Sequence, residues 1–311
     1  MEQKLPKIVV ICGPTASGKT GWSLHLAKKY NGEIISADSR QLYKKMDIGT
    51  AKPVGVWRWN GLRRTYFVDN LPHHLLDFLD PGRNFTVAEF RDKAIKYIKL
   101  ALQNKRLPII VGGTGLYLDA VINNFHIPQI PPNKKLRASL EGKSTEELIN
   151  WLEKLDPESA EWIDKRNRRR LVRALEVVML TGNSFSTQRQ KGEPLFEVLQ
   201  IGIALPREVL YNNIERRIAE QLQKGLLAEI QNLLKQKYSW ELPSLSSIGY
   251  RQFKDYFAGK ISLDAAVAKL KQDSRQYAKR QLTWFRKNKD IQWVATLPEA
   301  DKLVAQFLKT E

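Results

Sequence analysis

The stretch Gly13-Pro14-Thr15-Ala16-Ser17-Gly18-Lys19-Thr20 decides the fold of this chain. It follows the apolar run Ile8-Val9-Val10-Ile11-Cys12 and precedes an amphipathic segment over residues 21–30. A strand, a glycine-rich turn and a helix are the context in which the spacing GxxxxGK[ST] forms a phosphate-binding loop. The glycines let backbone N–H groups approach phosphate oxygens, and the N-terminal end of the helix adds positive potential. The sequence therefore predicts a phosphate or diphosphate site, with Lys19 facing the terminal phosphate and the Thr20 hydroxyl able to bind Mg²⁺.

Two further strand ends are predicted to meet this loop. Residues 33–38 form a short apolar run that ends in Asp38, and residues 107–111 form a buried run followed by Gly112-Gly113-Thr114. Ligands of open α/β sheets lie outside the carboxyl ends of the strands. Because strands alternate with helical segments here, we expect an α/β fold with a parallel, doubly wound sheet and one crevice at these three strand ends.

The composition limits the class of protein. The 311 residues, of which 42% are apolar, suffice for one large or two moderate domains. No apolar run approaches the length of a membrane span, and the N-terminus leads straight into the first strand, so we expect neither a membrane anchor nor a signal peptide. The single cysteine, Cys12, cannot form an internal disulfide and is predicted to be a core residue. These features indicate a cytoplasmic protein.

The charge of the chain points to a polyanionic partner. The net charge is +18, and six of the nine residues from Lys165 to Arg173 are Lys or Arg. With no membrane segment, the favoured partner is nucleic acid. The alternative is a basic surface that only faces solvent.

A change in composition predicts an insertion. Residues 125–133 are proline-rich, and the following segment to about residue 192 has helical patterns only. Residues 196–205 again form an apolar strand, so residues 126–195 are interpreted as a helical insertion between core segments 1–125 and 196–311. The second core segment is predicted to hold one long helix over residues 207–237, a helix over 263–287, a strand over 291–295 and a terminal helix.

Two segments allow more than one interpretation. Residues 54–70 interleave aromatic residues with arginines, which suits base stacking but suits a β-hairpin with a turn at Asn60-Gly61 better. Pro72-His73-His74 and the nearby Asp77 resemble metal ligands. Adjacent side chains diverge on a regular backbone, so we favour a role in positioning the loop.

Eight stretches occur in this order: GPTASGKT, ISADSRQLY, MDIGTAKP, PHHLLD, GGTGLYLDA, RRRLVRALEV, SIGYRQ and YAKRQLTWFRK. Together, over residues 8–287, they resemble the tRNA dimethylallyltransferase (tRNA isopentenyltransferase) family. The resemblance implies a P-loop NTPase-like core, in which helices flank a parallel β-sheet, and an all-helical insertion that holds the tRNA anticodon stem-loop. It also implies an activity: transfer of dimethylallyl from dimethylallyl diphosphate to N6 of the adenosine 3′ to the anticodon, with Mg²⁺, releasing diphosphate.

The resemblance also assigns residues. It implies catalytic roles for Asp38, Lys19 and Thr20, with Asp38 as the base for the adenine amine and Thr20 as a Mg²⁺ ligand. Diphosphate binding is implied for Gly13, Pro14, Thr15, Ala16, Ser17, Gly18, Lys19, Thr20 and Arg217. tRNA binding is implied for Asp38, Ser39, Arg40, Gln41, Thr114, Arg169, Arg170, Leu171, Val172, Arg173, Ser246, Ser247, Ile248, Gly249, Tyr250 and Arg251. Asn213 departs from the family, which often carries arginine there, and the family varies at Ser246.

Other activities remain open at this stage. An adenylate isopentenyltransferase would use the same chemistry on a free nucleotide, but the charge of +18 and the basic insertion argue against it. A P-loop kinase of a small metabolite and a non-catalytic RNA-binding protein fit the motifs less well. The expected partners are tRNA and dimethylallyl diphosphate, with no membrane, and the expected state is a monomer.

Overall fold

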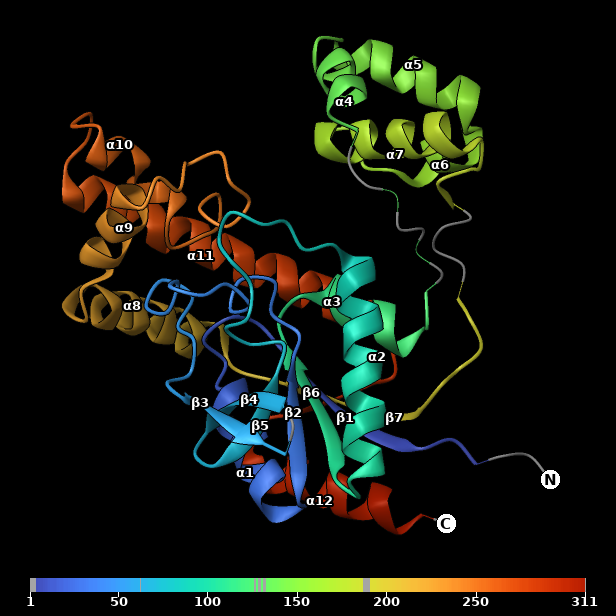
Figure 1. Cartoon of the computed structure of the whole chain (residues 1–311), viewed down its shortest axis with the longest axis vertical. Coiled ribbons are helices and arrows are strands. Elements are labelled where there is room, and N and C mark those ends of the chain that lie inside the picture. The colour runs from blue at the N-terminus through green and yellow to red at the C-terminus, as the bar shows by residue number, and fades with distance from the viewer. Residues whose placement is uncertain are drawn as a thin grey trace. The chain divides into compact units, whose positions relative to one another are not determined.

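A computed structural model of the chain describes residues 4–61, 63–125, 127, 130, 133–186 and 191–310 (Figure 1). The chain divides into two compact units. The α/β unit comprises Met1–Thr86, Phe90–Ile122 and Leu195–Glu311, and the helical unit comprises Val87–Glu89 and Asn123–Pro194. Within the described part of the chain, no helix combines the length and the hydrophobicity that crossing a bilayer requires.

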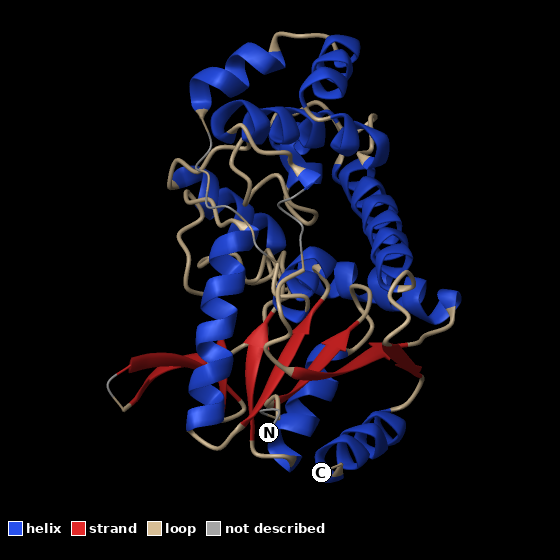
Figure 2. Ribbon diagram, turned by 90° about the vertical axis from the view of Figure 1, so that its right-hand side faces the viewer, coloured by secondary structure: helices blue, strands red, loops and turns tan. Residues whose placement is uncertain are grey.

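The described strands of the α/β unit form one eight-stranded sheet (Figure 2). They are β1 (Lys7–Cys12), β2 (Gly32–Ser36), β3 (Val56–Asn60), β4 (Arg63–Val68), β5 (Leu71–His74), β6 (Leu107–Gly112), β7 (Glu197–Ile203) and β8 (Ile291–Val294). Their order is β3-β4-β5-β2-β6-β1-β7-β8. The β3–β4 and β4–β5 pairs are antiparallel and the others parallel. The predicted parallel α/β sheet is confirmed, with an antiparallel extension at one edge.

The central strands are buried on both faces. In β1 the four residues Ile8, Val9, Val10 and Ile11 are at most 1% exposed, although successive side chains point to opposite faces. A parallel strand buried in this way has helices over both faces of its sheet. One layer of the core joins β1, β2, β6 and β7 to Leu26 and Val304, which lie on α1 (Lys19–Lys29) and α12 (Leu297–Lys309). This packing fixes the strand ends that carry the site.

The second core segment begins with two helices where one was predicted. α8 (Arg207–Gln223) and α9 (Leu226–Lys235) replace the expected helix over residues 207–237. The chain breaks at Gly225, whose φ of 93° lies in the left-handed region that glycine tolerates. The remaining helices of the unit are α2 (Val87–Gln103), α3 (Gly115–Ile122), η2 (Arg251–Phe253), α10 (Lys254–Phe257) and α11 (Leu263–Phe285).

The segment over residues 54–70 is a hairpin, as favoured from the sequence. β3 and β4 pair from Val56–Phe67 to Asn60–Arg63, so the turn starts at Gly61, one residue later than predicted. Residues 71–74 form β5, which the sequence analysis did not predict. His74 Nε2 lies 2.7 Å from Glu33 Oε2, and His73 Nδ1 lies 3.0 Å from the Leu71 carbonyl. Among the described residues, no cluster of three His, Cys, Asp or Glu side chains could hold a metal.

The helical unit packs α4 (Lys134–Glu141), α5 (Thr145–Leu155), α6 (Pro157–Trp162) and α7 (Arg168–Thr181) around their own core. Ser144 and Glu147 form a capping box at α5, and Asn167 caps α7. Glu176 on α7 is fully buried and accepts hydrogen bonds from Arg137 and Arg173. Burial alone would raise the pKa of Glu176, but these hydrogen bonds lower it to about 2.

Candidate active site

The phosphate-binding loop lies between β1 and α1, as its sequence predicts. Gly18 takes a left-handed conformation with φ 89° and lets α1 begin at Lys19. Lys19 Nζ donates a 2.6 Å hydrogen bond to the Pro14 carbonyl, across the loop. Burial lowers the pKa of Lys19 to about 8, and the negative charge of Asp38 opposes that shift. Asp38 is therefore close enough to influence the loop lysine electrostatically.

The turns after β2 and β6 lie beside this loop. Asp38 follows β2, and its Oδ1 accepts hydrogen bonds from the backbone N–H groups of Arg40 at 2.8 Å and Gln41 at 3.2 Å. Thr114 follows β6, and its Oγ1 accepts a 3.1 Å hydrogen bond from the Ser39 N–H. The strand order β2-β6-β1 makes the three strand ends neighbours. The predicted meeting of the loop, Asp38 and Thr114 is therefore observed.

Two helices from the C-terminal segment supply polar side chains opposite these strand ends. Arg217 on α8 donates to Thr15 Oγ1 at 3.2 Å and to the Thr50 carbonyl at 3.0 Å. Gln281 on α11 accepts from the Thr15 N–H at 2.8 Å and donates to the Gly113 carbonyl at 2.8 Å. One amide side chain thus joins the turns after β1 and β6. A Cβ atom at Gly113 would lie 2.3 Å from Gln281 Nε2, so this contact requires glycine.

The loop that contains Gly49-Thr50-Ala51-Lys52 is held from both of its sides. The Glu229 carboxylate on α9 accepts hydrogen bonds from three successive N–H groups, those of Asp47, Ile48 and Gly49, at 2.7–3.0 Å. The buried ammonium of Lys52 pairs with Asp47 at 2.5 Å and Asp77 at 2.7 Å. Such charge-assisted contacts keep the carbonyl and side chain of Thr50 in place beside Arg217.

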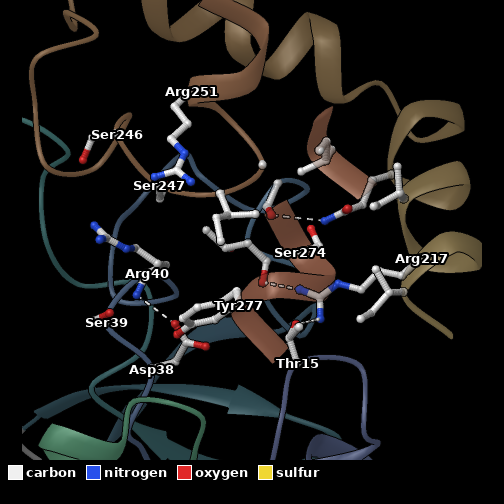
Figure 3. Close-up of a pocket in the computed structure, with 18 of the residues that line it drawn as sticks. Thr15, Asp38, Ser39, Arg40, Arg217, Ser246, Ser247, Arg251, Ser274 and Tyr277 are labelled. Atoms are coloured by element: carbon white, nitrogen blue, oxygen red, sulfur yellow. Dashed lines mark hydrogen bonds between the residues drawn. The ribbon is translucent and has the colours of Figure 1, made fainter. Parts of the chain in front are cut away.

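Two adjoining cavities lie over these elements. The smaller chamber, about 230 Å³, is lined by residues 15–20 of the phosphate-binding loop and reaches the apolar side chains of Ile34, Leu76 and Val111. The larger chamber, about 380 Å³, is lined by polar residues that include Ser39, Arg40, Ser246, Ser247 and Arg251 (Figure 3). Both chambers are lined by the same four residues, Thr15, Asp38, Arg217 and Tyr277. These four residues therefore mark the place where the two chambers meet.

Tyr277 on α11 lies beside Asp38 at this junction (Figure 3). Burial raises the pKa of Tyr277 to about 12, and the charge of Asp38 adds to the shift. The phenol therefore stays protonated at neutral pH and presents a hydrogen-bond donor next to a carboxylate. Asp38 Oδ2 makes no hydrogen bond within the described residues, so this oxygen is available to a ligand.

The sequence and the structure were compared with known proteins. The family model described as IPP transferase matches residues 41–288, and one described as isopentenyl transferase matches residues 6–74. A curated tRNA dimethylallyltransferase from Roseiflexus sp. (strain RS-1) is 42% identical over 295 residues, which cover 94% of this chain and 92% of the relative. The chain belongs to the IPP transferase family.

Solved structures of IPP transferases agree with this assignment. The tRNA isopentenylpyrophosphate transferase from Bacillus halodurans superposes with a TM-score of 0.71 at 38% identity, covering 97% of each chain. A structure titled as a eukaryotic dimethylallyltransferase acting on tRNA superposes with a TM-score of 0.77 at 27% identity, covering 97% of this chain and 77% of that one. The fold is the P-loop NTPase-like fold of these enzymes.

The structure brings most of the residues assigned from the IPP transferase resemblance to the two chambers. Residues 15–20 of the phosphate-binding loop, Asp38, Gln41 and Arg217 line the smaller chamber, whereas Gly13 and Pro14 do not. Asp38, Ser39, Arg40, Ser246, Ser247, Ile248, Gly249 and Arg251 line the larger one. Asn213, the residue that departs from the resemblance, donates to the Ala16 carbonyl at 3.3 Å and so contacts the loop.

Four of the side chains expected at tRNA are buried, those of Tyr250, Leu171, Val172 and Ser247. Tyr250 is fully buried, and its hydroxyl donates to Glu229 at 2.7 Å. Leu171 and Val172 lie in the core of the helical unit at 0% and 7% exposure. These side chains pack inside their units, so little of their surface is open to solvent.

The basic run on α7 is also divided by the packing of the helical unit. Arg173 is committed to buried Glu176 at 2.7 Å, and the Arg168 guanidinium donates to the carbonyls of Leu140 and Glu141 at the end of α4. Arg169 and Arg170 are exposed. Arg166, just before α7, is exposed as well, so these three arginines of the predicted cluster face solvent.

The sequence analysis missed Tyr277, Gln281 and Glu229. A signal existed for the first two, because Tyr-Ala-Lys-Arg-Gln over residues 277–281 places Tyr277 and Gln281 on one face of a helix. No sequence signal pointed to Glu229, since the backbone N–H groups that it binds lie about 180 residues earlier in the chain.

Proposed function

We propose that this chain transfers the dimethylallyl group of dimethylallyl diphosphate to N6 of the adenosine 3′ to the anticodon of tRNA and releases diphosphate. The observation that carries the proposal is the pair of chambers that meet at Asp38, Thr15, Arg217 and Tyr277. A transfer of a group between two substrates needs a binding space for each substrate and a place where the two spaces meet. Curated relatives named tRNA dimethylallyltransferase support the choice of substrates.

The smaller chamber suits the prenyl donor. The phosphate-binding loop offers N–H groups and Lys19 to a diphosphate, while Ile34, Leu76 and Val111 form an apolar end for the five-carbon tail. His73 lines this end, and burial lowers its pKa to about 4, so the ring is neutral and adds no charge beside the tail. The diphosphate and the hydrocarbon of one molecule are thus matched by the two ends of one cavity.

The chemistry follows from the groups at the junction. A bond forms between N6 of adenine and C1 of the dimethylallyl group while the bond from C1 to the diphosphate oxygen breaks. The amine loses a proton in this step, and Asp38 Oδ2 takes that proton as a general base. Negative charge develops on the departing diphosphate, where Lys19, the loop N–H groups and Arg217 stabilise it.

A magnesium ion fits the residues of the smaller chamber. Thr20, at the start of α1, places an exposed hydroxyl beside the loop, and Ser17 Oγ is buried without a hydrogen-bond partner. The described residues form no cage of acidic side chains, which suits an ion that is held mainly by substrate phosphates and water. Mg²⁺ bound to diphosphate would add charge to the leaving group, and Thr20 would contribute its one protein ligand.

The larger chamber suits an adenosine that has left the anticodon-loop stack. Ser39, Arg40, Ser246, Ser247 and Arg251 would contact the nucleotides around it. Arg169 and Arg170 of the helical unit would contact phosphates of the anticodon stem. We further propose that the enzyme acts as a monomer in the cytoplasm.

Incubation of the purified protein with a tRNA transcript and dimethylallyl diphosphate, followed by nucleoside mass spectrometry, tests the proposal. The expected product is one dimethylallyl adenosine per tRNA at the position after the anticodon, together with diphosphate. Parallel reactions supply AMP in place of tRNA, or ATP in place of the prenyl donor. Prenylation of AMP but not of tRNA, or turnover of ATP alone, would replace this function with one of the alternatives.

A further inference from the structure

The β3–β4 hairpin adjoins the active site. Its described side chains line neither chamber, but residues on both sides of it in the chain do. Ala51 and Pro53 line the smaller chamber, and β3 begins only three residues after Pro53. At about 3.3 Å per residue, this is about 10 Å of extended chain. On its other side β4 pairs with β5, whose His73 lines the same chamber. In Figure 2 the hairpin projects from the edge of the sheet.

One face of the hairpin carries a row of stacked side chains. Trp57 packs edge-on against buried Tyr66 with the ring centroids 5.6 Å apart, and the Arg64 guanidinium lies 6.0 Å from the Trp57 ring centroid. Trp59 is directly opposite Arg64 in the strand register and is 73% exposed. The Trp57 indole is anchored by a 3.0 Å hydrogen bond to Asp77 Oδ2. The row therefore runs from the core outward and ends in an exposed indole.

The same hairpin is strongly basic. Arg58, Arg63 and Arg64 are exposed, and no acidic residue occurs between Pro53 and Asp69. Arg63 and Arg64 form no ion pair within the described residues. Without a binding partner, this surface would expose a tryptophan and unpaired arginines at the edge of the sheet for no benefit. An exposed aromatic ring beside free arginines is instead the combination that binds single-stranded nucleic acid.

We propose that the β3–β4 hairpin is a second RNA-contact element, in which an unstacked nucleotide of the tRNA stacks on Trp59 and the adjoining phosphates meet Arg64 on the same face and Arg63 on the opposite face, beside the turn. The proposal rests on the proposed function for the identity of the RNA. Trp59 lies six residues beyond Pro53, so at most about 20 Å of extended chain separates it from the lining of the smaller chamber. The hairpin would thus add affinity without touching the reacting atoms.

A competing use of the same surface is pairing with a second copy of the chain through the outer edge of β3. Exposed Val54 and Val56 favour that contact. Three arginines without a carboxylate disfavour it, because two copies would bring like charges together. RNA is therefore the partner that this surface fits, and the experiment distinguishes RNA binding from self-association.

Two sets of variants test the proposal in the full-length protein. Trp59→Ala removes the stacking surface and Trp59→Phe keeps part of it, while Arg63→Gln with Arg64→Gln removes two charges. Lys302→Gln with Lys309→Gln removes two exposed charges from α12 and serves as the charge-matched control. The measurements are the tRNA dissociation constant over a range of salt concentrations, the single-turnover rate at saturating tRNA, and the mass in solution by sedimentation.

We expect Trp59→Ala to weaken tRNA binding roughly 5- to 100-fold, the contribution of one stacked base, and Trp59→Phe to restore most of that loss. The double arginine variant should lower the log–log salt slope by about one to two units, and the α12 control should not change it. The single-turnover rate at saturating tRNA should stay within about twofold of the wild type.

Two results would overturn the proposal. One is an unchanged dissociation constant for Trp59→Ala in a protein that still prenylates tRNA. The other is a wild-type dimer that Trp59→Ala converts to a monomer, which would assign the hairpin to self-association. If the wild-type protein did not prenylate tRNA at all, the proposed function would fail instead, so the two failures are distinguishable.

Discussion

Asp38 has two carboxylate oxygens in different surroundings. Oδ1 accepts hydrogen bonds from the backbone N–H groups of Arg40 and Gln41, which hold the side chain in one orientation. Oδ2 makes no hydrogen bond within the described residues, and the carboxylate lies where the two chambers meet and acts electrostatically on Lys19 and Tyr277. One oxygen therefore positions the residue, and the other is left for chemistry.

The substitution Asp38→Asn tests this division at the level of one atom. The asparagine side chain keeps an oxygen for the two N–H groups but cannot accept a proton at neutral pH. We expect the single-turnover rate to fall roughly a hundred- to ten-thousandfold, while the affinities for tRNA and dimethylallyl diphosphate change only a few-fold. Lost tRNA or Mg²⁺ binding, with intact chemistry in the bound state, would make Asp38 an anchor instead.

Lys19 gives a second test, through pH. Because its pKa in the free protein is lowered to about 8, the ammonium is present below that pH and is lost as the pH rises through it. We expect kcat/KM for dimethylallyl diphosphate to decline above a pH of about 8, and Lys19→Arg to abolish that decline because arginine stays charged.

Loss of the Lys19 charge altogether has a larger consequence. Lys19→Ala should lower turnover by on the order of a hundredfold or more, as the loss of an oxyanion donor does, with folding and tRNA affinity unchanged. Near-normal turnover by this variant would show that the diphosphate binds elsewhere.

At the scale of elements, the site depends on how α8, α9 and α11 hold three loops. Gln281 on α11 joins the loops after β1 and β6, and Arg217 on α8 joins Thr15 to Thr50. Glu229 on α9 gathers three N–H groups of the loop over residues 47–49 and the hydroxyl of Tyr250. One carboxylate thus satisfies three successive N–H groups of the loop, two of which are at least partly buried, and the loop conformation depends on it.

Glu229→Gln tests that dependence with little change in size. The glutamine side chain lacks the negative charge that strengthens these hydrogen bonds. Its NH₂ group would face backbone N–H donors, with which it cannot form a hydrogen bond. We expect the free energy of unfolding to fall by about 1–3 kcal/mol and the KM for dimethylallyl diphosphate to rise, because Ala51 and Pro53 line its chamber. Glu241→Gln is the control, since Glu241 is exposed and pairs only with exposed Lys254. Equal unfolding free energies for the two variants would show that the loop is held by other contacts.

At the scale of the whole molecule, the arginines that contribute to the net charge of +18 have two roles. Some stabilise the fold, and others face solvent. Arg137 and Arg173 neutralise buried Glu176, and Arg168 is bonded to the end of α4. Arg169 and Arg170 remain exposed at the start of α7. A basic cluster in the sequence therefore overstates the basic surface that can meet RNA.

A pair of double variants separates these roles in tRNA binding. Arg169→Gln with Arg170→Gln should weaken tRNA binding and lower the log–log salt slope by about one to two units, without loss of stability. Arg137→Gln with Arg173→Gln should instead destabilise the helical unit, because Glu176 would be left buried without its ion-pair partners. An unchanged slope in the first variant would place α7 away from the RNA.

The sequence by itself determined the features that depend on neighbours in the chain. The spacing from Gly13 to Thr20 and the apolar runs before Thr114 and Asp38 act through local backbone geometry, so their structures could be predicted. The hairpin over residues 54–70 was predictable for the same reason. The break at Gly225 was not, because the helical pattern continues on both sides of it.

Only the tertiary structure decided which side chains face the site. Gln281 is separated from Thr15 by 266 residues and Glu229 from Asp47 by 182, so no local pattern relates them. In the same way, packing turned Tyr250, Leu171 and Val172 inward, although the motifs around them resemble RNA contacts. The burial of a side chain depends on what packs against its element, and that partner comes from a distant part of the chain.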